Sequence, residues 1–314
     1  MLLSITPNPA VDRTLTVRGF RTSEVTRIAA IHEAAGGKGL NVVRAVQTLG
    51  ERVRAVAPLG GAAGRRVAEL AAAEHMDARW VWLEAGETRT CQIVLDPDAP
   101  DTLVLNEQGP RMSPDDWQTF AEAVRAEAHQ ARALASSGSL PPGVAVDWFI
   151  GLLTSVIEQG TPVWLDTSGA PLARALDLPL GLLKVNMHEL GAALDTQLSS
   201  ADEVIEAALA VLRRGPQAVV VTLGKDGVIA VNAHGAWHAQ TPPVHAISPT
   251  GSGDAVLAGV AVALLEDRPL MEAARLGAAC GAANTLMIGG CVFNMDDVRA
   301  LEQATRVDII RTKA

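Results

Sequence analysis

Short apolar runs alternate with longer helix-like segments along nearly the whole chain, and this alternation limits the possible folds more than any other feature. The apolar runs are typical of strands: "LLSI", "RVRAVAPLG", "RALASSG", "PVWLD", "LLKVN" and "QAVVVTLG". Helical spacing predicts helices over residues 38–49, 64–75, 114–131, 146–159 and 201–214. In the third, Ser113 can cap the helix, Pro114 suits its first position and Asp116 completes a capping box. Strands alternating with helices favour an α/β fold, in which helices cover both faces of a parallel sheet.

Two regions depart from this alternation. Residues 11–33 and 87–106 show a period of two with turn residues and no intervening helix, which predicts two hairpins. We expect the hairpins to form a small antiparallel sheet beside the main domain, as a lid. Residues 1–10, 34–86 and 107–314 then form the α/β core, and the part after Gly253 is largely helical.

Charge and cysteine content exclude several classes of function. The 314 residues carry a formal net charge of −9 and no long basic run, so we expect no nucleic-acid partner. Cys91, Cys280 and Cys291 are odd in number and widely spaced, which is typical of reduced thiols in a cytoplasmic protein. The start, "MLLSITPNPAVDR", has too short an apolar run for a signal peptide. No apolar stretch is long enough to span a bilayer, so we also expect no membrane partner.

The stretch "SPTGSGDAVLAG" places a carboxylate directly behind a glycine loop, at the start of a helix expected over about residues 254–265. Glycines and a helix N-terminus present backbone N–H groups that bind anions. The loop is neither a Walker A sequence nor the dinucleotide fingerprint. An acid beside an anion site suits a base that takes a proton from a hydroxyl while the N–H groups stabilise a moving phosphoryl group. The alternative is that Asp254 only interacts with the helix dipole.

Six motifs occur in one order along the chain: "AAGGKGLNVVRAVQTLG", "SSGSLPPG", "WLDTSG", "KVNMHEL", "VTLGKDG" and "SPTGSGDAVLAG". This ordered set resembles the ribokinase-like PfkB carbohydrate kinases, in particular their phosphosugar branch. That branch contains 1-phosphofructokinase, tagatose-6-phosphate kinase and a minor type of 6-phosphofructokinase. The resemblance implies a doubly wound central β-sheet flanked by helices, with a small β-sheet lid. It also implies ATP and Mg²⁺ as the nucleotide and metal.

The resemblance assigns the catalytic residues and the sugar-binding residues. Asp254 is implied as the catalytic base, and Gly251, Ser252 and Gly253 as the anion hole. The implied sugar-binding residues are Asp12, Gly36, Gly37, Lys38 and Asn41. Without the resemblance, Asp12 reads as a turn-capping residue and "GGKG" as an ordinary loop before a helix.

A kinase of this branch also binds the phosphate already present on its substrate, and cationic side chains suit that task. Lys38, Arg89 and Ser139 match the positions that the branch uses, and Arg27 is a further candidate on the first lid hairpin. A lone Arg on a hairpin is otherwise an ordinary surface residue.

On the nucleotide side, the resemblance implies Lys184, Asn186 and Glu189, with Val185 in place of the usual proline. Asn186 and Glu189 are the implied magnesium ligands, and a magnesium ion that keeps several waters needs few protein ligands. Other implied nucleotide-binding residues line the phosphates and ribose (Thr222, Gly224, Gly227) or border the adenine (Gly281, Asn284).

Two other functions fit the sequence poorly. His234 and His238 in "HGAWH" are four residues apart, but they lie in an expected hairpin without a third ligand nearby. "SSGSLPPG" does not match the Gly-x-Ser-x-Gly turn of a serine hydrolase.

The sequence therefore predicts an ATP-dependent kinase that phosphorylates a ketohexose monophosphate: tagatose 6-phosphate, fructose 1-phosphate or fructose 6-phosphate. "GGKGLN" together with "SPTGSGD" favours tagatose 6-phosphate. Two alternatives stay open: a ribokinase-type or nucleoside-type kinase acting on an unphosphorylated acceptor, and a catalytically silent sugar-phosphate sensor. Apolar edges of the lid hairpins predict a homodimer formed through the lid.

Overall fold

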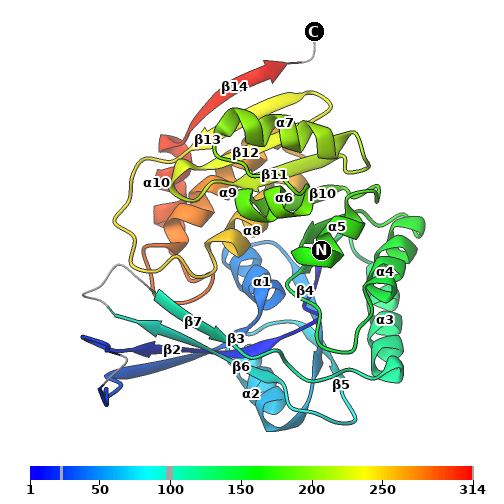
Figure 1. Ribbon diagram of the computed structural model, residues 1–314, viewed down its shortest axis with the longest axis vertical. Helices are drawn as coiled ribbons and strands as arrows, with labels where there is room; N and C mark the ends of the chain where they lie inside the picture. Colours follow the sequence, from blue (N-terminus) through cyan, green and yellow to red (C-terminus); the bar gives the residue numbers. More distant parts are fainter. Residues whose placement is uncertain (22–23, 97–101, 313–314) are drawn as a thin grey trace.

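A large sheet and a smaller sheet organise the protein, as Figure 1 shows for the computed structural model, which describes residues 1–21, 24–96 and 102–312. The large sheet has the strand order β14-β13-β12-β11-β10-β9-β8-β1-β4-β5. Its strands are β1 Leu2–Ile5, β4 Val53–Leu59, β5 Ala78–Trp82, β8 Ala133–Ser137, β9 Val163–Asp166, β10 Leu182–Asn186, β11 Ala218–Thr222, β12 Val228–Asn232, β13 Gly235–Gln240 and β14 Arg306–Thr312.

The prediction of a parallel sheet is right for part of this sheet only. The pairs from β5 through β11 are parallel, whereas β12, β13 and β14 are antiparallel additions at one edge. Strands β5 and β14 were not predicted. The six predicted strands are all present, each within one or two residues of its expected bounds. His234 and His238 lie at the β12–β13 hairpin, as expected.

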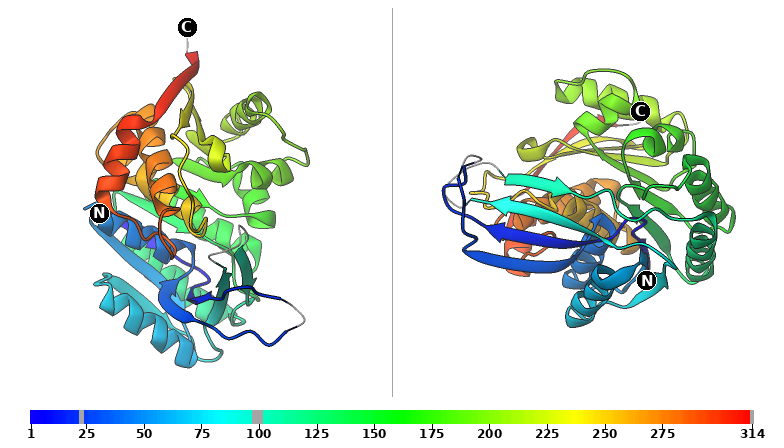
Figure 2. Two further views of the ribbon diagram at one scale, coloured as in Figure 1. Left: turned by 90° about the vertical axis from the view of Figure 1, so that its left-hand side faces the viewer. Right: turned by 60° about the horizontal axis from the view of Figure 1, so that its bottom comes forward.

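Helices cover both faces of the large sheet, as predicted (Figure 2). One layer holds α1 Lys38–Thr48, α2 Gly61–Ala73, α8 Ser252–Leu265, α9 Leu270–Asn284 and α10 Met295–Ala304. The other holds α3 Pro114–Ala128, α4 Val146–Glu158, α5 Gly169–Ala175, α6 Met187–Ala193 and α7 Ala201–Leu212. Alternate strand residues supply the two cores: Val220 packs on the first side and Val219 and Val221 on the second.

Helix bounds follow their capping chemistry. Ser113 and Asp116 form the predicted capping box at the start of α3, with Pro114 in the first turn. Helix α2 begins at Gly61, three residues before the expected start. Helix α8 is apolar on all sides and almost wholly buried, so it lies between α1 and α9 inside the first layer. In the part of the chain that the structure describes, no helix is both long and apolar enough to cross a membrane.

The smaller sheet comprises β2 Ala10–Thr16, β3 Ala30–Gly36, β6 Arg89–Leu95 and β7 Thr102–Asn106, in the order β3-β2-β6-β7. The two predicted hairpins, β2–β3 and β6–β7, are antiparallel. The expectation of a wholly antiparallel sheet is wrong, because β2 and β6 join the hairpins in a parallel pair. Parts of both expected lid segments, residues 22–23 and 97–101, lie outside the described residues. The sheet lies at the carboxyl ends of the parallel strands and will be called the lid (Figure 1).

Candidate active site

A cavity of about 500 Å³ opens between the lid and the start of α8. Because parallel strands end at this edge of the sheet, their following loops gather polar side chains here. Most of the predicted catalytic, sugar-binding and magnesium-binding residues line the cavity: Asp12, Gly37, Lys38, Asn41, Arg89, Ser139, Lys184, Asn186, Glu189, Gly251, Gly253 and Asp254. Residues up to 242 positions apart in the sequence thus face one space.

A second cavity of about 620 Å³ lies on the other side of the glycine loop. Predicted nucleotide-binding residues line it: Thr222, Gly224, Gly227 and Gly281, together with Ser252 of the loop. Thr222 and Gly253 line both cavities. The two cavities therefore meet at the glycine loop, with Asp254 on the lid side.

Three predicted site residues do not line either cavity. Arg27 is exposed in the segment between β2 and β3. Gly36 lies against Asp12, and a Cβ atom at position 36 would collide with the Asp12 carboxylate. Asn284 is fully buried and hydrogen-bonds to the glycine loop without lining either cavity.

Asn284 fixes the shape of the glycine loop. Its Nδ2 donates to the carbonyl oxygen of Thr250 at 2.8 Å and to Oγ of Ser252 at 3.0 Å. Its Oδ1 accepts from the backbone N–H of Cys291 at 2.8 Å. Gly251 has a φ of +81°, and a Cβ there would lie 2.7 Å from Cα of Gly290. The loop thus requires glycine for both its backbone angle and its close approach to the segment after α9.

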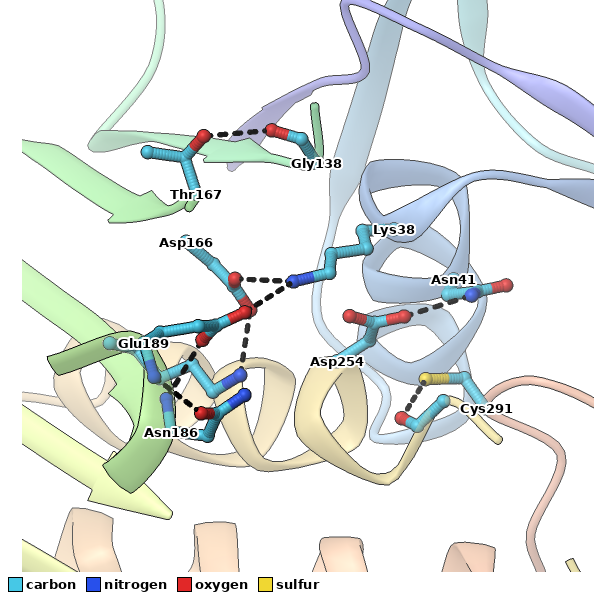
Figure 3. A network of polar contacts seen from close by, with 11 residues as sticks. Lys38, Asn41, Gly138, Asp166, Thr167, Asn186, Glu189, Asp254 and Cys291 are labelled. Carbon is cyan, nitrogen blue, oxygen red and sulfur yellow. Dashed lines mark hydrogen bonds and ion pairs between the residues drawn. The ribbon is translucent and has the colours of Figure 1, made fainter. Parts of the chain in front are cut away.

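Asp254 lies in the first turn of α8 and is only 5% exposed. Its Oδ2 accepts a hydrogen bond from Nδ2 of Asn41 at 2.9 Å (Figure 3). Burial raises the pKa of Asp254 to about 6, and Asp166 adds to this, while Lys38, Lys184 and the Asn41 hydrogen bond lower it. A carboxylate with a pKa near 6 is ionised at neutral pH and accepts a proton more readily than an ordinary Asp.

Two lysines share one buried carboxylate beside Asp254. Nζ of Lys38 lies 2.8 Å from Oδ1 of Asp166, and Nζ of Lys184 lies 2.7 Å from Oδ2. Burial alone would raise the pKa of Asp166. Lys184 and Lys38 lower it by more than burial raises it, so the pKa of Asp166 lies below its usual value. Burial would lower the pKa of Lys38, yet Asp166, Asp254 and Glu189 together raise it. Asp166 and Lys38 are therefore both charged.

Asp166 was not predicted as a site residue, although "WLDTSG" was among the quoted motifs. The available signal was its position as a polar residue at the end of a buried strand, where loops of a parallel sheet carry functional groups. Asn8, in "NPAVD" just before β2, was also not predicted as a site residue, although it contacts both Arg89 and Ser139.

Asn186 and Glu189 form a reciprocal capping box at the start of α6. Oδ1 of Asn186 accepts from the backbone N–H of Glu189 at 2.8 Å, and Oε2 of Glu189 accepts from that of Asn186 at 2.9 Å. Oε1 of Glu189 lies 3.8 Å from Nζ of Lys38. Both side chains offer hard oxygen donors of the kind that Mg²⁺ prefers. Among the described residues, no three His, Cys, Asp or Glu side chains gather as a metal site.

Arg89 and Ser139 face the lid side of the cavity and are linked through Asn8. Arg89 donates to the carbonyl oxygens of Asn8 at 2.9 Å and Glu107 at 3.1 Å. Nδ2 of Asn8 donates to Oγ of Ser139 at 3.3 Å. Nearby, burial raises the pKa of Asp12, although the Gly37 N–H and Arg89 oppose the shift. This part of the cavity combines one Arg, one hydroxyl and one carboxylate.

A model of the pfkB family carbohydrate kinases matches residues 6–296, and the chain belongs to this family of sugar kinases. Phosphofructokinase-2 from Escherichia coli in complex with fructose-6-phosphate has a TM-score of 0.87 and 28% identity, over 96% of this chain and 98% of that one. Its complex with substrates and products has a TM-score of 0.90 and 29% identity, over the same shares.

A possible 1-phosphofructokinase from Thermotoga maritima has a TM-score of 0.90 and 23% identity, over 99% of both chains. These similarities confirm the predicted ribokinase-like α/β fold with its separate small sheet.

Proposed function

We propose that the protein transfers the terminal phosphoryl group of ATP to a hydroxyl of a ketohexose monophosphate. The observation that supports this most directly is the meeting of the two cavities at the glycine loop, with Asp254 on the lid side. A nucleotide in one cavity and a sugar in the other would bring donor and acceptor together at this loop. Phosphoryl transfer depends mainly on positioning and on stabilising charge, which this arrangement supplies.

In this proposal, Asp254 accepts the proton of the attacking hydroxyl. The N-terminus of α8 stabilises negative charge on the transferred group through its free backbone N–H groups and its dipole. Lys38 and Lys184 supply positive charge beside the same point, and Asp166 holds both in place. Gly253 allows close approach, since a Cβ there would lie 2.8 Å from Nζ of Lys184.

Asn186 and Glu189 are the residues that would hold Mg²⁺, which neutralises charge on the nucleotide phosphates. The second cavity would hold the nucleotide, with Thr222, Gly224 and Gly227 along its phosphates and ribose and Gly281 near the base. We also propose that the protein acts in the cytoplasm, where ATP is present. The three cysteines are free and buried, which fits a compartment that keeps thiols reduced.

Arg89, Ser139 and Lys38 are the proposed ligands of the phosphate that the substrate already carries. Arg89 is a suitable anion ligand because its Nε is buried and has no hydrogen-bond partner among the residues that the structure describes. The E. coli phosphofructokinase-2 with 28% identity was solved with fructose-6-phosphate, which supports a phosphosugar substrate here. We propose tagatose 6-phosphate or fructose 1-phosphate as the preferred substrate, on the sequence of the glycine motifs.

The proposal is tested by ADP release with Mg·ATP against tagatose 6-phosphate, fructose 1-phosphate, fructose 6-phosphate, free fructose and ribose. We expect turnover on phosphorylated sugars only and its loss in Asp254→Asn. Arg89→Ala should raise KM for the sugar phosphate at least about tenfold, because a hydrogen bond between charged groups is lost. Arg174→Ala is the matched control, since Arg174 is exposed on α5 and lines neither cavity.

Other results of this assay would favour the alternatives. Turnover on free sugars would favour a kinase for unphosphorylated acceptors and would contradict the roles of Arg89 and Lys38. Calorimetric binding of a sugar phosphate without any turnover would favour the sensor.

We also propose a homodimer formed through the lid. Apolar side chains on its two edge strands are about half exposed: Ile31, Leu103 and Leu105. A second copy would cover them, and E. coli phosphofructokinase-2 has a tetrameric inhibited form. Light scattering should give a dimer that Leu105→Glu dissociates, whereas Ile309→Glu, on exposed β14, should not. A monomeric mass for the unaltered protein would exclude this dimer.

A further inference from the structure

Arg44 lies one helical turn after Asn41 on α1 and lines neither cavity. Its side chain is only 12% exposed. A long cationic side chain is rarely buried to this degree without several partners. Arg44 has partners from four separate segments of the chain.

The first partner of Arg44 is the amide of Asn41. NH1 of Arg44 donates to Oδ1 of Asn41 at 2.9 Å, and Nδ2 of Asn41 donates to Oδ2 of Asp254 at 2.9 Å. A guanidinium only donates hydrogen bonds, so the amide oxygen must face Arg44. The amide nitrogen must then face Asp254. In the flipped orientation, the amide oxygen would face the carboxylate, and both hydrogen bonds would be lost.

Other contacts hold Arg44 itself in place. It donates to the carbonyl oxygen of Ala35 at the end of β3 at 2.7 Å and to that of Gly290 at 2.8 Å. Nε and NH2 both donate to the carboxylate of Glu74, which follows α2. The guanidinium thus joins α1, the end of a lid strand, the residue after α2 and the segment after α9.

Gly290 also limits the Asn41 amide from the other side. A Cβ at position 290 would lie 2.9 Å from Nδ2 and Oδ1 of Asn41. The amide therefore packs against the backbone at Gly290 while Arg44 fixes which of its ends faces Asp254.

We propose that Arg44 is a positioning residue, which orients the Asn41 amide so that its NH₂ group donates to the catalytic base Asp254. This inference rests on the proposed function, in which Asp254 takes the proton of the sugar hydroxyl. Arg44 lines neither cavity and, among the described residues, reaches the base through Asn41. Its charge also lowers the pKa of Asp12, an effect that does not depend on Asn41. Loss of Arg44 would leave the amide free to rotate, and the ionised base would lose a hydrogen bond that stabilises it.

Other charged or titratable groups near Asp254 come from different elements: Lys38 on α1, Asp166 on β9, Lys184 on β10 and Cys291 after α9. In the described part of the chain, none of them hydrogen-bonds to Arg44. The charge of Arg44 lowers the pKa of Cys291, but burial holds that pKa well above its usual value, so the thiol stays neutral in either case. A change in the titration of Asp254 in an Arg44 variant would therefore report on the Asn41 hydrogen bond.

The kinetic test is a double-mutant cycle of Arg44→Met and Asn41→Ala with the best sugar phosphate. We expect Arg44→Met to lower kcat at pH 7 about tenfold, in line with the loss of one hydrogen bond to a charged group. In the Asn41→Ala background, Arg44→Met should change kcat less than about twofold, because the Asn41 amide that Arg44 orients is absent. Equal losses in both backgrounds would overturn the proposal.

Arg268→Met is the matched control for stability. Arg268 is 26% exposed, bonds Glu272 and Glu302, and lines neither cavity. We expect it to lower the melting temperature without changing kcat. A fall in kcat that follows the melting temperature across both Arg variants would show that Arg44 has only a structural role.

A second readout does not need activity. The side-chain NH₂ resonances of Asn41, assigned by their absence in Asn41→Ala, should follow the ionisation of Asp254 in a pH titration by NMR. In Arg44→Met, the midpoint should rise by about one pH unit or the dependence should disappear. An unchanged titration would overturn the role of Arg44 even if no sugar were phosphorylated. Absence of turnover together with the expected titration change would instead overturn the proposed function alone.

Discussion

Nζ of Lys184 lies 2.7 Å from Oδ2 of Asp166, and the two side chains are 4% and 0% exposed. Nζ of Lys38 completes the group at 2.8 Å from the other oxygen of the same carboxylate. Desolvation of the buried Asp166 and Lys184 charges is costly, and the cost is offset only while each charge has its partner. The group therefore links the carboxyl end of β9 and the middle of β10 to the start of α1, close to Asp254.

Lys184→Met should destabilise the protein, because it removes one partner from a buried carboxylate. We expect a loss of about 3 kcal/mol in the free energy of unfolding, as for other broken buried pairs. Urea denaturation at pH 7 measures it. Arg214→Met breaks an exposed pair with Asp177 and should cost less than about 1 kcal/mol. Equal losses in the free energy of unfolding for Lys184→Met and Arg214→Met would contradict the prediction that the buried group stabilises the fold more than an exposed ion pair.

The acid side of the pH–rate profile should report Asp254. Its pKa is raised to about 6 by burial, so the base becomes protonated, and inactive, as the pH falls below that value. We expect kcat/KM for the sugar phosphate, at saturating Mg·ATP, to fall tenfold per pH unit below about 6. An ordinary exposed Asp would place this limb near pH 4. A profile that is flat down to pH 5 would therefore contradict the buried ionised base.

The raised pKa of Asp254 also predicts that the base reduces the stability of the fold. The folded protein holds the Asp254 proton up to about pH 6, whereas an unfolded Asp releases it near its model value of 3.8. Between these values the folded state binds more protons, so this contribution to stability falls as the pH rises. Above pH 6 the accumulated cost is about 3 kcal/mol, at 1.36 kcal/mol per unit.

Asp254→Asn should therefore be more stable than the unaltered protein at pH 7, although it is inactive. The difference in the free energy of unfolding should shrink as the pH is lowered from 6 toward 4. Thermal or urea unfolding at several pH values measures it. Asp177→Asn, at an exposed ion pair, serves as the control and should show no such gain. A less stable Asp254→Asn at pH 7 would contradict the sign of this shift.

Local patterns were sufficient to predict much of this protein. Periodicity predicted α1, α2, α3, α4, α7 and α8 to within a few residues, because helix signals such as the capping box of Ser113 and Asp116 are short-range. The short helices α5 and α6 were not predicted. The family resemblance implied that Asp254, Lys38 and Arg89 serve one site, and the three residues line one cavity.

The features that sequence reasoning missed depend on distant contacts. The parallel pairing of β2 with β6 joins two hairpins, and neither hairpin carries a local signal for it. Strand β14 is a partly polar edge segment whose strand conformation depends on pairing with β13. The support from Arg44 likewise depends on Gly290, 246 residues away, so nothing near Arg44 in the sequence indicates it.

Gly251→Ala and Gly50→Ala form a matched pair that separates backbone strain from loop geometry. Both glycines have positive φ, +81° and +86°. A Cβ at position 50 meets nothing within 4 Å, so Gly50→Ala should cost about 1 kcal/mol from backbone strain alone. At position 251 the Cβ would lie 2.7 Å from the backbone at Gly290, which cannot move aside as a side chain can.

Gly251→Ala should therefore shift the glycine loop and misplace the N–H groups that stabilise the transferred phosphoryl group. We expect kcat to fall by about a hundredfold or more, as when an enzyme loses one donor to a developing negative charge. Gly50→Ala should keep kcat within about twofold. Steady-state kinetics and urea unfolding of the two variants make the comparison. If the two variants lost stability equally and both kept kcat, the close contact of the loop with Gly290 would have no part in catalysis.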